Sequence, residues 1–169
     1  MKKQGFTLIE LMVVIVIMGI LAAVAVPKLF GMIAKSKASE VTPAAGEYIK
    51  LQDAFVSELN TYVGSFKIIG YKMDNGTVFS YTDGFPATGS NGTTAIPTAA
   101  GTAGWQAKAL VGLNECSQNS TWALFPAQAT DKNGLKWRAA VKKAGNAAVG
   151  DKDIDCTVLT SSFLQMDHP

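Results

Sequence analysis

The chain has 169 residues, of which 48% are hydrophobic and 17% are charged, and its formal net charge is +2. Two of its 15 basic residues are Lys2 and Lys3, so removal of the first five residues would leave 13 basic against 13 acidic side chains. A chain without net basic charge is not expected to bind nucleic acid directly.

The first predicted element is an apolar helix long enough to cross a membrane. Residues 6–26 carry a single charged side chain, that of Glu10, and as a helix they would span about 31 Å at 1.5 Å per residue. This length matches the hydrocarbon core of a bilayer, which is roughly 30 Å thick. An ionised carboxylate in such a segment costs on the order of 2.5–3.5 kcal/mol. Glu10 either reaches back to the lipid headgroups or has a partner that offsets this cost.

The residues before this run form a short basic stretch that ends in Gly5, directly before Phe6. The string KKQGFTLIELMVVIVIMGILAAVAVP resembles the N-terminus of type IV pilins, which is shared with the pseudopilins of type II secretion. The resemblance is detailed in this region and looser beyond it. It implies that residues 1–5 are a leader peptide, that a prepilin peptidase cuts between Gly5 and Phe6, and that the same enzyme N-methylates Phe6.

Cleavage at this position would also give Glu10 a role. It creates an amine on Phe6, four residues before Glu10 on the same predicted helical face, and the amine of an incoming subunit can meet the Glu10 carboxylate of a packed one. We expect this pair to fix the register of filament assembly. Gly19, together with Ala23, offers a small surface for close helix approach, and the resemblance implies that the stretch from Gly19 to Pro27 can lose helicity in the filament. Pro27 should kink or loosen the helix, because it cannot donate a hydrogen bond to Ala23.

The helical pattern continues after the anchor (residues 6–27) and becomes amphipathic over residues 28–66. Apolar side chains recur there at spacings of three and four: Tyr48, Leu51, Phe55, Leu59, Tyr62 and Phe66. Such a stripe is typical of a helix face that packs on a sheet, although the sequence does not separate packing from an electron-transfer stack of rings. Pro43 and Gly46 form a second weak point, which predicts a gentle S-shaped curve in the long helix.

Residues 67–169 are predicted to form a globular head, with a connecting loop over 67–106 and an antiparallel sheet over 107–169. Strand-like runs occur at Thr77–Tyr81, Ala107–Leu113, Thr121–Phe125, Leu135–Val141 and Cys156–Leu159. The corner from Lys132 to Gly134 is typical of a hairpin turn. A long helix followed by hairpins predicts an α+β fold, in which the sheet packs on the C-terminal half of the curved helix.

The chain has two cysteines, Cys116 and Cys156. In the cytosol they would be buried thiols, whereas beyond a membrane a bridge closing a loop of this length would stabilise the fold by about 4 kcal/mol. The membrane run favours the bridge, and the pair resembles the C-terminal disulfide loop of pilins. Trp105, Trp122 and Trp137 are expected in the sheet core or at its edge, where an exposed one could instead stack on a sugar.

Catalytic and metal sites find little support in the sequence. The single histidine, His168, stands next to the C-terminus and offers no credible base to a serine or cysteine nucleophile. Asp151, Asp153 and Asp155 imitate the first ligands of a calcium loop, but a cysteine replaces its glycine and a serine its last glutamate. They are a weak calcium candidate, and we expect no enzymatic activity, no cofactor and no metal.

The expected function is that of a structural subunit. A type IV pilin would wait in the bacterial inner membrane as a single-pass protein and then polymerise through its N-terminal helix into an extracellular pilus used for adhesion, motility or DNA uptake. Its expected partners are other pilins, the prepilin peptidase and the inner-membrane assembly machinery. The alternatives are a type II secretion pseudopilin, a minor pilin acting as a surface-binding module, and an anchored enzyme that uses the leader only for export.

Overall fold

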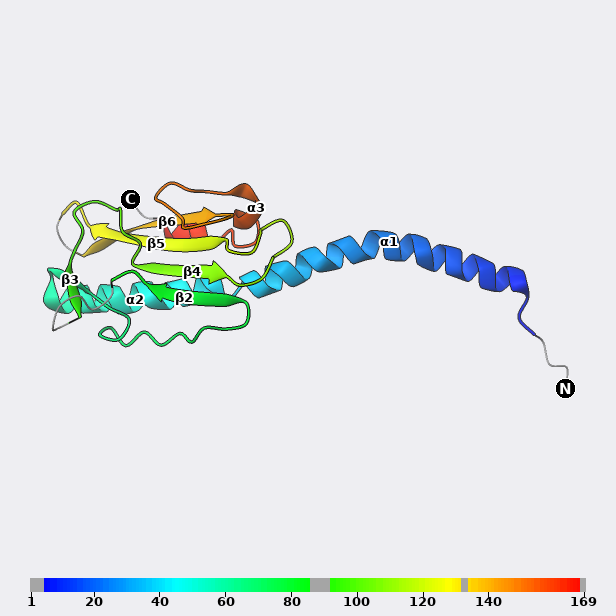
Figure 1. Ribbon diagram of the computed structural model, residues 1–169, viewed down its shortest axis with the longest axis horizontal. Coiled ribbons are helices and arrows are strands. Elements are labelled where there is room, and N and C mark those ends of the chain that lie inside the picture. Colours follow the sequence, from blue (N-terminus) through cyan, green and yellow to red (C-terminus); the bar gives the residue numbers. More distant parts are fainter. Residues whose placement is uncertain (1–4, 86–91, 132–133, 168–169) are drawn as a thin grey trace.

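The computed structural model describes residues 5–85, 92–131 and 134–167. The chain opens with helix α1 (Leu8–Ala38), and after a two-residue turn helix α2 (Val41–Leu59) follows. Figure 1 shows α2 lying within the head, whereas most of α1 extends away from it as a bowed helix. Together the two helices trace a shallow S, so the long curved N-terminal helix of the predicted fold is confirmed.

The turn between α1 and α2 lies at Ser39 and Glu40. Pro43 explains this position, because its ring clashes with the carbonyl four residues earlier, that of Ser39, and its nitrogen has no hydrogen to donate to it. In the first turn of α2 the missing N–H costs little, since the first N–H groups of a helix have no partner within it. Pro27, in contrast, lies inside α1 without ending it. The helix is thus interrupted just before Pro43, at the second predicted weak point, and not at Gly46.

Helix α2 ends at Leu59, short of the predicted residue 66. Asn60 terminates it in the left-handed conformation, with φ 57°, and its N–H donates to the Val56 carbonyl at 2.6 Å. Asparagine is one of the few residues besides glycine that adopts this cap readily. Tyr62 therefore begins a strand and Phe66 lies in the turn after it. The stripe predicted for one helix is shared between α2 and the segment that follows.

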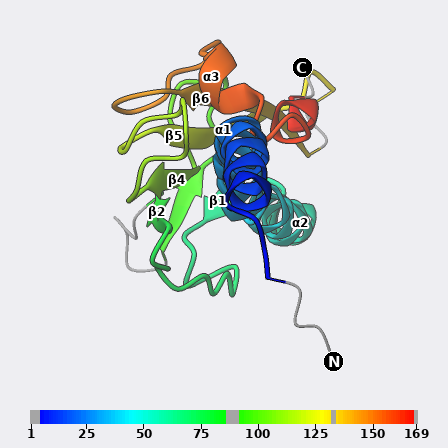
Figure 2. The ribbon, with the colours of Figure 1, turned by 90° about the vertical axis from the view of Figure 1, so that its right-hand side faces the viewer.

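Two antiparallel sheets complete the described part of the head. The larger has the order β2-β4-β5-β6, formed by β2 (Phe79–Asp83), β4 (Trp105–Ala109), β5 (Thr121–Gln128) and β6 (Leu135–Lys142). The smaller pairs β1 (Tyr62–Gly64) with β3 (Thr93–Ala95). Figure 2 looks along the helices and shows the larger sheet on one side of them. The α+β class and the antiparallel sheet are confirmed.

The predicted strands differ in accuracy. Those at Thr121–Phe125 and Leu135–Val141 coincide closely with β5 and β6, whereas those at Thr77–Tyr81 and Ala107–Leu113 are displaced from β2 and β4. The predicted loop over 67–106 contains β2, β3 and the start of β4, so it is only partly a connection. Strands β5 and β6 pair up to Gln128 and Leu135 as a hairpin would, but Lys132 and Asn133 lie outside the described residues.

The strand predicted at Cys156–Leu159 is wrong. Residues Ile154–Thr157 form the short helix α3, and the 3₁₀-helix η1 (Phe163–Met166) follows it. The side chain of Asp153 accepts a hydrogen bond from the Asp155 N–H at 3.1 Å and so caps α3. An aspartate in this position favours the start of a helix over the continuation of a strand.

Tyr48 is the centre of the core between α2 and the sheet. Its ring is fully buried and meets the rings of Phe66, Tyr71 and Trp137 edge to face, at centroid distances of 5.6, 5.7 and 5.7 Å. Aromatic rings prefer such contacts because the positive edge of one faces the negative face of the other. Burial raises the pKa of the Tyr48 hydroxyl far above its usual value, so this hydroxyl stays neutral.

All three tryptophans are core residues, as predicted, with 0, 0 and 4% of the surface of Trp105, Trp122 and Trp137 exposed. Each indole N–H has an acceptor: the Tyr71 hydroxyl for Trp105 at 2.8 Å, the Thr160 hydroxyl for Trp122 at 2.7 Å, and Asp53 Oδ1 for Trp137 at 3.1 Å. No tryptophan is therefore available to stack on a sugar. The tryptophans therefore give no support to the surface-binding alternative.

Gln52 ties the smaller sheet to α2. Its side chain is fully buried, its Nε2 donates to the Gly64 carbonyl at 2.8 Å, and its Oε1 accepts from the Gly64 N–H at 2.9 Å. The amide also donates to the Tyr48 hydroxyl at 3.0 Å. One side chain thus provides β1 with the donor and the acceptor that a neighbouring strand would supply.

We expect Gln52→Leu to lower the free energy of unfolding by about 2–4 kcal/mol, because it leaves both backbone groups of Gly64 buried without partners, at about 1–3 kcal/mol each. Gln106→Leu on β4 is the matched control, since the half-buried Gln106 side chain makes no hydrogen bond within the described structure. Denaturant unfolding in detergent, followed by tryptophan fluorescence, measures both variants. Equal losses in the two would contradict the role of Gln52.

Candidate assembly surface

Helix α1 presents an apolar surface that the described part of the chain does not cover. Of its 31 residues, only Ala34 and Ala38 are buried. Its large apolar side chains between Leu11 and Val26 are 46–73% exposed. Within the described residues, Leu8–Leu59 is the one helical region that is long and apolar enough to cross a membrane. An apolar surface of this size marks a site of contact with lipid or with other protein chains.

Glu10 closes the first turn of α1 in a capping box with Thr7. The Glu10 N–H donates to Thr7 Oγ1 at 3.3 Å, and Glu10 Oε2 accepts from the Thr7 N–H at 2.8 Å and from the Thr7 hydroxyl at 2.6 Å. The sequence holds the T-x-x-E signature of this motif, yet Thr7 was not among the predicted site residues. Glu10 is exposed, and its other oxygen, Oε1, has no hydrogen-bond donor among the described residues.

Gly5 and Phe6 precede the helix and do not lie on it. Thr7, the N-cap of α1, has an extended backbone with φ −81° and ψ 151°, so Phe6 does not share a helical face with Glu10 in this structure. The Phe6 residue is 92% exposed, and a Cβ placed on Gly5 would meet no atom within 4 Å. The other residues of the predicted leader, 1–4, lie outside the described part of the chain.

Gly19 and Pro27 occupy the uncovered length of α1. A Cβ on Gly19 would meet no atom within 4 Å, so packing within the chain does not require a glycine there. The missing side chain instead leaves room for another helix to approach. Pro27 lies inside α1, where its lack of an N–H removes the bond to Ala23 and weakens the helix locally.

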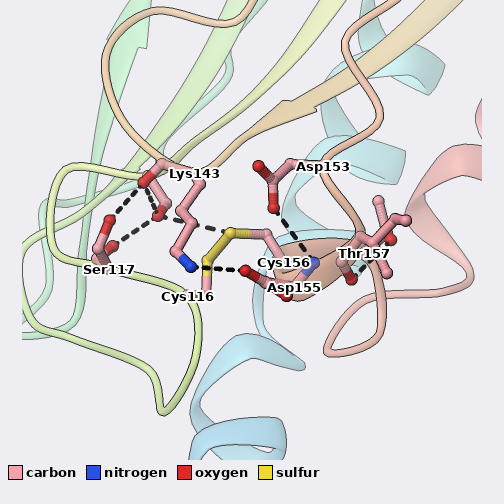
Figure 3. Close-up of polar contacts among 9 residues, drawn as sticks. Cys116, Ser117, Lys143, Asp153, Asp155, Cys156 and Thr157 are labelled. Carbon is pink, nitrogen blue, oxygen red and sulfur yellow. Dashed lines mark hydrogen bonds and ion pairs between the residues drawn. A yellow bond between two sulfur atoms is a disulfide. The ribbon is translucent and has the colours of Figure 1, made fainter.

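The expected disulfide is present in the head. Cys116 and Cys156 are joined at an S–S distance of 2.03 Å, both are fully buried, and Ser120 Oγ lies 3.5 Å from Cys156 Sγ. Figure 3 shows the bridge between the loop that follows β4 and helix α3. Beside it, Lys143 Nζ contacts Asp155 Oδ2 at 2.5 Å, and this hydrogen bond raises the pKa of the lysine. The C-terminal segment is thereby joined covalently to the loop after β4, and an exposed ion pair joins it to the residue after β6.

The three aspartates of the calcium candidate each have a different task. Asp151 accepts from the Ala148 N–H at 2.9 Å, Asp153 caps α3, and Asp155 pairs with Lys143. In the parts of the chain that the structure describes, no three His, Cys, Asp or Glu side chains come together in a way that could hold a metal ion. The structure therefore does not assemble these carboxylates into a calcium site. His168 lies outside the described residues.

We expect the double variant Cys116→Ala/Cys156→Ala to lose about 4 kcal/mol of unfolding free energy, because the bridge closes a loop with a sequence separation of 40. Unfolding of the wild type with and without reductant, compared with the double variant, measures this loss. Peptide mapping without reductant provides the chemical check. Two free thiols in the native protein would contradict the bridge.

Comparison with known proteins finds similar proteins among those named as pilin, fimbrial and pilus components. Residues 1–26 match the prokaryotic N-terminal methylation motif. The type IV major pilin protein PilA of Myxococcus xanthus is 39% identical to this chain, over 47% of this chain and 36% of that protein. The type IV major fimbrial protein FimA of Dichelobacter nodosus is 51% identical, over 27% of this chain and 29% of that protein. The type IV wide pilus major component PilA4 of Thermus thermophilus is 37% identical, over 38% of this chain and 49% of that protein. Each match spans less than half of the relative's length. The predicted resemblance to type IV pilins is confirmed.

Proposed function

We propose that this chain is the structural subunit of a type IV pilus, held in the bacterial inner membrane by α1 and then polymerised through the same helix. The observation that carries the proposal is α1 itself, which is exposed over nearly all of its 31 residues and attached to a folded head. The similar proteins named as major pilin, fimbrial and pilus components support it. A soluble domain would not leave such a surface uncovered.

The proposed organisation follows the structure from the N-terminus. Residues 1–5 are the leader, residues 6–27 form the single-pass anchor, and the rest of α1 together with α2 forms the spine of the head up to Leu59. The remaining residues build the sheets and the disulfide-closed C-terminal region. The pseudopilin alternative draws on the same N-terminal features, and no observation in the head favours it.

Processing at Gly5 fits the extended backbone that precedes α1. A peptidase must bind its substrate as an extended strand, and Phe6 and Thr7 stand outside the helix, with Phe6 exposed. Cutting the bond between Gly5 and Phe6 leaves the capping box and all of α1 intact. The prepilin peptidase is the proposed partner for this step and for methylation of the new Phe6 amine.

The capping box prepares Glu10 for assembly. Thr7 occupies Oε2 and holds the carboxylate at the helix start, while Oε1 keeps its lone pairs for a donor from another chain. The Phe6 amine of a second subunit is the proposed donor. Neither charge is readily buried alone, and when they meet their attraction offsets part of the desolvation penalty of both. A subunit in the wrong register would leave both unpaired, so the pair selects one arrangement.

We expect Gly5→Leu to leave an unprocessed precursor in the membrane, because a bulky side chain hinders the peptidase. The substitution does not disturb the fold, since no atom of the chain lies within 4 Å of a Cβ at Gly5. Gly31→Ala, at another glycine with the same open surroundings, is the matched control and should be processed normally. Gel mobility and mass spectrometry of the membrane fraction distinguish precursor from product. A fully trimmed Gly5→Leu protein would refute the assigned site.

We expect Glu10→Gln to be processed normally but to lower the yield of sheared filaments at least tenfold. A tenfold change is equivalent to about 1.4 kcal/mol. Glutamine can still complete the capping box, but it cannot neutralise an amine. Glu10→Val should behave in the same way, although it also removes the carboxylate half of the capping box. Filament protein in the sheared fraction is measured against total subunit.

Thr7→Val separates the two roles of this site, because it removes the cap and keeps the carboxylate. We expect this variant to assemble better than Glu10→Gln. If Glu10→Gln forms filaments at the wild-type level while Thr7→Val does not, Glu10 serves only as a helix cap and the proposed pairing is wrong.

A further inference from the structure

The apolar surface of α1 continues past the length that a bilayer covers. Leu29, Phe30, Met32 and Ile33, which we call the shoulder, are 42–60% exposed. They follow the run from Phe6 to Val26, which by itself matches a hydrocarbon core of roughly 30 Å. The membrane therefore does not account for the shoulder when the helix stands upright. The described part of the chain leaves most of it uncovered as well, although Phe30 and Ile33 border a pocket that Gly112 and Asn114 of the head also line.

A second apolar surface that the described residues leave uncovered lies at the opposite end of the head. A groove of about 490 Å³, which we call the tip groove, is lined by Phe55, Leu59, Tyr62, Ile68 and Thr93. Leu59, Tyr62 and Ile68 are 47, 45 and 43% exposed. Figure 1 shows the C-terminal end of α2 and strand β3, which border this groove, at the end of the head farthest from the N-terminus.

We propose that the tip groove of one subunit receives the shoulder of a second copy of this chain. The inference rests on the proposed function and names a contact within that filament. The two surfaces are different and lie at separate places along one molecule, so each subunit that makes the contact still offers one free surface of each kind. A heterologous contact of this type propagates into an open filament unless it closes into a ring.

The charges of the two helices favour this pairing. Between Leu11 and Ala38, α1 carries three exposed lysines and no carboxylate: Lys28, Lys35 and Lys37. Helix α2 forms one wall of the tip groove, and Glu58 is its carboxylate at that end, since Asp53 is half-buried and accepts from the Trp137 indole. Glu58 is exposed next to Leu59, whereas Lys67 stands next to Ile68 in the turn that lines the groove. Complementary charge of this kind orients an approaching helix more than it adds affinity.

The proposal has a geometric consequence. Leu29 and Phe55 are 26 residues apart along the two nearly continuous helices, which corresponds to about 39 Å at 1.5 Å per residue. Two subunits in contact would therefore be displaced by about 40 Å along the filament axis. The same separation means that the shoulder and the tip groove of a single chain cannot touch, so any crosslink between them joins two copies.

Photo-crosslinking in intact filaments tests the contact. Tyr62→p-benzoylphenylalanine places a reactive ring in the tip groove, and trypsin releases the whole shoulder as the peptide Leu29–Lys35. We expect irradiated filaments to yield subunit pairs in which position 62 is bonded to this peptide. Ile154→p-benzoylphenylalanine is the control, because Ile154 is 77% exposed on α3, outside both surfaces. Crosslinks from position 62 that reach only other segments, only a foreign molecule, or nothing would overturn the proposal.

Charge substitutions give the functional test. We expect Ile68→Asp and Met32→Asp each to lower the yield of sheared filaments about tenfold, whereas Val158→Asp, at a residue 64% exposed on the other side of the head, leaves it unchanged. If the wild type forms filaments and Ile68→Asp gives the same filament yield, this contact is wrong but the proposed function still holds. Absence of wild-type filaments would remove both. If Ile68→Asp also lowers the unfolding midpoint, the crosslinks at position 62 decide.

Discussion

The uncovered apolar surface of α1 is the constraint on which the rest of the molecule depends. Fully burying one large aliphatic side chain stabilises a protein by about 1.5–3 kcal/mol, and α1 leaves nearly all of its own exposed. Lipid chains and neighbouring helices are about equally apolar, so burial of this surface is favourable in either environment and does not by itself select one of them. In the proposed assembly, the few polar groups on the helix make this choice, namely Glu10 with its cap and the lysines that begin at Lys28.

Helix α2 supplies residues at the centre of the head's core. Tyr48 and Gln52, both from α2, provide the centre of the aromatic cluster and the hydrogen-bonding edge of β1. The hydroxyl of Tyr71 accepts from Trp105 on β4 at 2.8 Å and donates to the Ala44 carbonyl at 3.2 Å, which links the sheet to the same helix. A force applied to the helix therefore reaches the sheets through buried contacts and not through a hinge.

Local signals in the sequence predicted α1, the β5–β6 hairpin and the position of the disulfide, because each depends on nearby residues or on a single pair. The end of α2 was missed, since apolar spacing continues past Leu59 while the left-handed conformation of Asn60 leaves no trace in it. The contact of Gln52 with Gly64 is non-local and could not be read from the chain. Thr7 is a different case: its T-x-x-E signature was available and marks the helix start.

The two buried alanines of α1 determine how far the N-terminus can be shortened to obtain a water-soluble fragment with an intact core. Ala34 and Ala38 are 4 and 0% exposed, so the head closes over the last turns of α1 and not only over α2. A fragment that lacks the residues up to Pro27 loses only surface that the head does not contact. A fragment that begins at Val41 would also lack Ala34 and Ala38 and would expose this part of the core. A soluble version for crystals or for antibody production should therefore retain the helix from upstream of Ala34.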